Sequence, residues 1–86
     1  MYTKRQLISY IKHLCTDTLD ISRSFHLVFY NRMKKFSRKT LEIMFVNIID
    51  TGLSAADFEG FEDEQELLQL IDCTLQAMGD YVFHPD

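Results

Sequence analysis

Five basic side chains lie within the stretch NRMKKFSRK, which runs from position 31 to position 39. Lysine and arginine at this density can hold the phosphates of a nucleic acid, a membrane surface or an acidic protein partner. The aromatic ring of Phe36 interrupts the basic run, which is compatible with a nucleic-acid contact. This basic patch consists of Arg32, Lys34, Lys35, Arg38 and Lys39.

The position of these bases relative to expected helix ends favours a protein contact. The three bases before Phe36 fall in the last turn of one helix, where the helix dipole favours cations. The two bases after it fall in the first turn of the next helix, where the dipole disfavours them, so we expect carboxylates to compensate. The acids between positions 59 and 66 are the obvious candidates. The next helix also lacks the polar face of a DNA-recognition helix, so nucleic-acid binding through phosphates is the alternative hypothesis.

The charges divide the chain into two parts of opposite sign. Residues 1–39 contain all nine Lys and Arg beside two acids, whereas residues 40–86 contain eleven acids and no Lys or Arg. An asymmetry of this kind indicates interaction surfaces rather than a particular fold. It allows the two parts to pair within one chain or between two chains, and the acidic part would repel a polyanion.

Two aromatic residues stand within an acidic stretch, ADFEGFEDE, that begins at position 56. Aromatic anchors within a charged rim are typical of protein-binding hot spots. We therefore predict that this segment binds another protein, as an inhibitor or adaptor would; the same carboxylates also suit a solvated helix start. As a calcium loop it lacks the glycine and the glutamate that such a loop needs. The predicted partner-binding residues are Phe58, Glu59, Phe61, Glu62, Asp63, Glu64 and Glu66.

Groups suited to catalysis or metal binding are few. The bases available near neutral pH are His13, His26 and His84, and no Gly-rich phosphate loop, GxSxG or HExxH motif occurs. Cys15 and Cys73 form no close-spaced pair, and each falls in an apolar helical pattern. We expect two buried free thiols in a reducing compartment, no disulfide, no metal or other cofactor, and no enzyme activity.

The periodicity of apolar residues predicts a small all-α domain of four helices, over residues 3–15, 21–35, 38–50 and 62–78. Thr3, either Asp17 or Asp20, and Ser37 are the expected N-caps, and Gly52 and Gly79 are the expected stops. If Ser37 does not cap, the second and third helices fuse. The run FHLVFY is rich in strand-forming residues, but its neighbours keep the helical step.

The length of 86 residues allows one domain over residues 1–86, with residues 80–86 as a tail that either docks like a strand or frays. No apolar run reaches the length of a membrane span and no signal peptide is recognisable, so we expect a cytoplasmic protein without membrane contact. The expected third helix is apolar almost all round, in a chain that is 47% hydrophobic. This predicts a helix buried on most sides and a homodimer through Leu41, Met44, Phe45 and Ile48.

Overall fold

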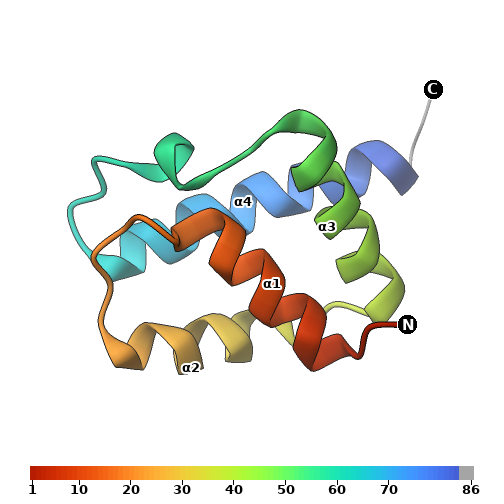
Figure 1. Ribbon diagram of the computed structural model, residues 1–86, viewed down its shortest axis with the longest axis horizontal. Coiled ribbons are helices and arrows are strands. Elements are labelled where there is room, and N and C mark those ends of the chain that lie inside the picture. Colours follow the sequence, from red (N-terminus) through yellow and green to blue (C-terminus); the bar gives the residue numbers. More distant parts are fainter. Residues whose placement is uncertain (84–86) are drawn as a thin grey trace.

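The structure, a computed structural model, describes the backbone of residues 1–83 and the side chains of residues 1–78. Over this part the chain is all-helical, with no strand (Figure 1). This confirms the predicted fold class of four helices and shows that the second and third helices are separate. The elements are α1 (Lys4–Thr16), α2 (Arg23–Met33), α3 (Arg38–Thr51), the 3-10 turn η1 (Ala55–Phe58) and α4 (Glu64–Phe83).

Local capping signals set several of the helix ends. At the start of α1 the Gln6 N–H donates to Thr3 Oγ1 (3.1 Å) and the Thr3 N–H donates to Gln6 Oε1 (2.9 Å), which is a complete capping box. The Thr40 N–H donates to Ser37 Oγ (3.1 Å), so Ser37 caps α3 as predicted. At the other end of α3, Gly52 is left-handed with φ of 73° and closes the helix.

Two predicted helix ends are wrong. Ser22, rather than Asp17 or Asp20, is the N-cap of α2. The predicted stop at Gly79 fails, because α4 continues through it to Phe83. One glycine weakens a helix by only about 1 kcal/mol, and the first proline that could stop it is Pro85. Most of the predicted tail is therefore helical, and its residues 84–86 lie outside the described part.

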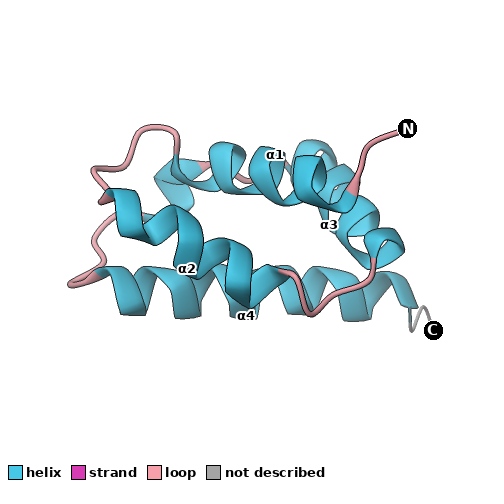
Figure 2. Cartoon of the chain, turned by 90° about the horizontal axis from the view of Figure 1, so that it is seen from below, coloured by secondary structure: helices cyan, strands magenta, loops and turns pink. Residues whose placement is uncertain are grey.

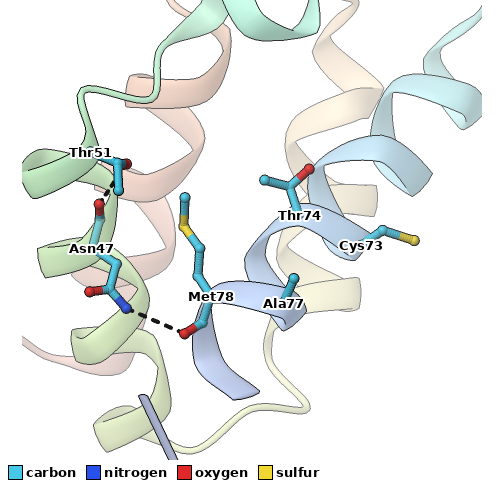
Figure 3. A pocket seen from close by; sticks show the side chains of 6 residues that line it. All are labelled: Asn47, Thr51, Cys73, Thr74, Ala77 and Met78. Atoms are coloured by element: carbon cyan, nitrogen blue, oxygen red, sulfur yellow. Dashed lines mark hydrogen bonds between the residues drawn. The ribbon is translucent and has the colours of Figure 1, made fainter. Parts of the chain in front are cut away.

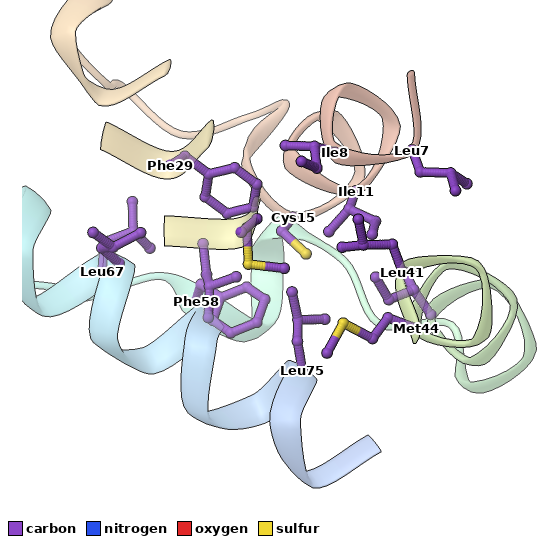
Figure 4. Packing of buried hydrophobic residues seen from close by; sticks show 14 of the residues in the cluster. Leu7, Ile8, Ile11, Cys15, Phe29, Leu41, Met44, Phe58, Leu67 and Leu75 are labelled. Atoms are coloured by element: carbon purple, nitrogen blue, oxygen red, sulfur yellow. The ribbon is translucent and has the colours of Figure 1, made fainter. Parts of the chain in front are cut away.

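The longest helix, α4, runs along the molecule, and the other helices pack on it and on each other (Figures 1 and 2). α2 lies along the first part of α4, and α3 crosses near the other end. α1 packs against α2, α3 and η1. All five elements contribute to one core, made by Leu7, Ile8, Ile11, Cys15, Phe25, Phe29, Met33, Leu41, Met44, Ile48, Phe58, Leu67, Leu68, Ile71 and Leu75 (Figure 4).

The third helix is less buried than its composition suggests. Its core face consists of Leu41, Met44 and Ile48, each at most 1% exposed. On other sides Val46 is 49% and Ile49 is 58% exposed. Periodicity shows that a helix is apolar all round, but it does not show which sides find neighbours. Among the described residues, no helix is long and apolar enough to cross a membrane.

Candidate protein-binding surface

The first part of the basic patch is held by one buried carboxylate of α4. Arg32 Nη1 lies 2.9 Å and Lys35 Nζ lies 3.5 Å from Asp72 Oδ2. The Asp72 side chain is only 5% exposed, while both cations remain partly exposed. The basic and acidic parts of the chain therefore pair within one chain, as the charge asymmetry allows, but through a residue that the sequence did not single out.

The charge state of Asp72 follows from its neighbours. Burial alone would raise the pKa of this carboxyl, but the hydrogen bond from Arg32, the Gln76 amide and the Lys35 charge outweigh it, so the net pKa is lowered. Its second oxygen, Oδ1, is buried without a hydrogen bond of normal geometry among the described residues. The carboxylate is thus charged at neutral pH and belongs to the structural frame of the molecule.

The second part of the basic patch is compensated differently from the prediction. Arg38 Nη2 pairs with Glu42 Oε2 (2.8 Å) on its own helix, and Arg38 Nε donates to the carbonyl oxygen of Tyr2 (2.7 Å). Within one chain, Arg38 does not pair with the acids at 59–66, because those acids lie at or just before the start of α4, far along the molecule (Figure 1). Lys34 and Lys39 form no salt bridge with any described side chain.

The aromatic side chains of the acidic stretch pack in or against the core, and some of its carboxylates cap helices. Phe58 is only 4% exposed because the turn η1 directs it into the core, and Phe61 packs partly against the core. Asp63 Oδ1 accepts the Glu66 N–H (2.8 Å) and so caps α4. Of the seven residues predicted to bind a partner, Glu59, Glu62 and Glu66 remain on the surface without a structural role in their side chains.

Glu64 joins the starts of two helices. Its Oε1 accepts the Ser22 hydroxyl (2.6 Å) and its Oε2 accepts the Ser22 N–H (2.5 Å). These hydrogen bonds lower the pKa of the Glu64 carboxyl, and the one from the hydroxyl has the largest effect. The side chain therefore connects the N-terminus of α2 to that of α4, rather than facing a partner.

An exposed aromatic cluster that the sequence did not reveal lies between α1 and α3. Tyr2 meets Tyr10 edge to face with ring centroids 5.2 Å apart, and Phe45 lies 6.1 Å from Tyr2 and 5.9 Å from Tyr10. Tyr2 and Tyr10 are 46% and 39% exposed. With Ile49 they form what we call the aromatic patch, around a hollow of about 250 Å³ that His13 and Leu14 also line.

The residue types of the aromatic patch gave no signal in the sequence. Phe45 and Ile49 are one turn apart and share a side of α3, but Tyr2 precedes α1 and Tyr10 flanks its apolar face. Only the crossing of α1 over α3 brings the four together. Phe45 was predicted to meet a second copy of the chain, and it is the one of those four residues that is not in the buried core.

A larger hollow of about 640 Å³ lies between α3 and α4 (Figure 3). Neutral residues line it, and Asn47 Nδ2 donates to the carbonyl oxygen of Met78 (3.4 Å). Cys73 lies at its edge with an exposed thiol, so the prediction that this cysteine is buried is wrong, whereas Cys15 is buried. The lining residues are Asn47, Thr51, Cys73, Thr74, Ala77 and Met78, which supply no acid or base to activate a nucleophile.

The two described histidines line different hollows. His13 lies at the edge of the aromatic patch, and His26 contacts Lys12 Nζ through its Nδ1 in the groove between α1 and α2. His84 lies outside the described residues. Within the described part, no group of three His, Cys, Asp or Glu side chains could hold a metal ion.

Comparisons with protein-family models, with curated proteins and with solved structures found no match to this chain. The surfaces themselves are therefore the guide to its function.

Proposed function

We propose that this protein is a small non-catalytic regulatory or adaptor protein that binds another protein through the aromatic patch. The observation that carries the proposal is the exposed cluster of Tyr2, Tyr10 and Phe45 beside Ile49, which is itself 58% exposed. Tyrosine is enriched at protein interfaces because one end of its ring system is apolar and the other forms hydrogen bonds. A patch of three aromatic rings and one branched aliphatic side chain therefore suits the centre of a protein contact.

The aromatic patch is ordered before any partner arrives. Arg38 Nε donates to the Tyr2 carbonyl oxygen at 2.7 Å, while Nη2 of the same guanidinium donates to Glu42 Oε2 at 2.8 Å. This arrangement keeps the residues before α1 against α3, so that Tyr2 stays in the cluster. A preformed surface loses less conformational entropy on binding, which improves affinity without further contacts.

The remaining charges support protein binding over nucleic-acid binding. Carboxylates engage three of the five bases in the basic patch, which leaves Lys34 and Lys39 for phosphates. The affinity of a protein for DNA grows with the number of phosphates that it neutralises, and two lysines neutralise few. Glu59, Glu62 and Glu66 are exposed around the start of α4, where they can steer a basic partner towards the protein.

A photo-crosslinking amino acid at position 10 tests the proposal in the native cell. We expect position 10 to crosslink to a distinct protein. Ile49→Asp should abolish the crosslink without unfolding the protein, because Ile49 is exposed on α3. Leu27 is the matched control, because it is an apolar residue 64% exposed on α2, remote from the patch in sequence and on another helix. Equal crosslinking from positions 10 and 27, or none from position 10, would contradict the proposal.

A further inference from the structure

α3 carries a cation and an anion at the unfavourable ends of its own dipole. Lys39 lies in its first turn and Asp50 in its last, and neither forms a salt bridge with a described side chain. A helix dipole disfavours cations at its N-terminus and anions at its C-terminus. The neighbouring Arg38 has Glu42 and the Tyr2 carbonyl, so Lys39 and Asp50 are the two charges of α3 that need an external partner.

These two residues belong to one straight stripe along the outer side of α3. Lys39, Ile43, Val46 and Asp50 follow the spacing i, i+4, i+7 and i+11, which places them on one side of a helix. The opposite side holds the core residues Leu41, Met44 and Ile48. Val46 is 49% exposed, and a hollow of about 180 Å³ lies at the middle of the stripe between Glu42, Ile43, Val46 and Asn47.

The stripe is complementary to a second copy of itself that runs in the opposite direction. Lys39 and Asp50 lie equally far from a midpoint between Met44 and Phe45, and Ile43 and Val46 share that midpoint. Two copies of α3 that run antiparallel about this point place each Lys39 beside Asp50 of the other copy and each Ile43 beside Val46. A two-fold contact requires self-complementarity of this kind.

We infer that this face of α3 docks on the same face of a second copy of this chain, in an antiparallel two-fold dimer. Each Lys39 then lies near the negative end of the other copy's α3, and each Asp50 near its positive end, so the pairing relieves the unfavourable dipole contacts of both. The contact also covers the exposed Val46.

The size of the contact determines its strength. A helix of this length is about 21 Å long, so a single helix pair buries less surface than the roughly 1,200–2,000 Å² of a typical stable interface. We therefore expect a dissociation constant in the micromolar range. The stripe lies between about a quarter and a third of a turn round α3 from Ile49 and Phe45. A dimer therefore carries two aromatic patches, and the inference goes beyond the proposed function.

Charge exchange between positions 39 and 50 tests the inference by sedimentation of the full chain over a dilution series. The wild type should reach twice the chain mass of 10.2 kDa at high concentration. K39D and D50K each place like charges opposite one another twice per dimer, and should raise the dissociation constant about tenfold or more. The double variant K39D/D50K restores opposite charges, and should return to within about threefold of the wild type.

The folded state is not at risk in these variants, because each substitution suits the dipole of α3 better than the residue it replaces. K34D is the control for a charge reversal at an exposed lysine outside the stripe, and it should leave the dissociation constant unchanged. The inference is overturned if the wild type stays at the chain mass up to about 1 mM. It is equally overturned if the single variants dimerise like the wild type, or if the double variant fails to recover.

Discussion

At the scale of single residues, Asp72 has the most consequential position in the molecule. It lies on α4 with its side chain 5% exposed, and its carboxylate forms ion pairs with Arg32 and Lys35 near the end of α2. Removal of one member of a buried ion pair costs more than the pair contributes, because the remaining charge is left without compensation. Here both cations are partly exposed, so hydration of Arg32 and Lys35 would reduce the destabilisation.

We predict that Asp72→Asn lowers the free energy of unfolding by about 1–3 kcal/mol at pH 7. The pKa of Asp72 is lowered in the folded state from its ordinary value of 3.8, so its contribution is present above about pH 4 and is lost as the pH falls below it. Urea unfolding should therefore show a large difference in unfolding free energy between wild type and variant at neutral pH, and a small difference at acid pH.

Glu62→Gln is the control for the loss of an exposed carboxylate, and it should change the unfolding free energy little at either pH. A deficit in Asp72→Asn that is the same at both pH values would show that the ion pair is not its cause.

The sequence predicted carboxylate partners for Arg38 and Lys39, with the acids at 59–66 as candidates, and none for Arg32, whose charge suits the end of its own helix. Arg38 forms a salt bridge with Glu42, one turn away on the same helix. Arg32 forms one with Asp72, forty residues later in the sequence, on a helix whose position depends on the whole fold. Similarly, Phe58 was expected at the surface because its neighbours are acidic. The direction of one side chain in a short 3-10 turn is set by packing, which composition does not encode.

At the scale of elements, the end of α3 depends on the left-handed backbone of Gly52. Its N–H donates to the carbonyl oxygens of Ile48 and Ile49 at the end of the helix, and its φ of 73° disfavours other residues. An added methyl group at this position would meet no atom within 4 Å. The requirement for glycine is therefore one of backbone conformation and not of space.

We predict that Gly52→Ala destabilises the protein by about 1 kcal/mol and that Gly52→Asn costs less, because asparagine tolerates the left-handed conformation better. Chemical denaturation of the three proteins gives this order directly. If alanine at this position were as stable as glycine, the conformational explanation would be wrong.

Helix ends were predictable where the signal is local. Thr3, Ser37 and Gly52 act through hydrogen bonds or dihedral angles within four residues, and all three predictions are confirmed. Gly79 was a weaker signal, because a glycine ends a helix only if the residues after it cannot continue the helix. The residues that follow it, Asp80 to Phe83, do continue it.

At the scale of the whole molecule, the reactivity of the two cysteines distinguishes the folded protein from the unfolded one. Burial raises the pKa of the Cys15 thiol to about 12, and the charge of Asp57 adds to this effect. Cys73 is exposed on α4. Since the thiolate is the reactive form, Cys15 becomes reactive only when the core around it opens.

We predict that an alkylating reagent at pH 8 labels Cys73 in the native protein within minutes, while Cys15 is labelled only at the rate of unfolding. Mass spectrometry should find one adduct under native conditions and two in denaturant. The variant Cys73→Ser should take up none in the native state, and rapid labelling of that variant would contradict the buried environment of Cys15.

The arrangement of helices determined what the sequence left open about surfaces. An apolar circumference on α3 was visible in the sequence, but its division into a core face, an aromatic side and an outer stripe came from its contacts with α1 and α4. The dimer prediction therefore selected Leu41, Met44 and Ile48, which are buried within the chain itself. The two tyrosines of the aromatic patch became neighbours of Phe45 only through the crossing of α1 and α3.

The dependence of the core on α4 bears on how the protein is made in the cell. α4 supplies Leu67, Leu68, Ile71 and Leu75 to the core. Until the ribosome has released this segment, the apolar sides of α2 and α3 that pack on α4 have no surface to cover them. The nascent chain exposes these sides until α4 emerges, and we expect it to be a substrate for ribosome-associated chaperones.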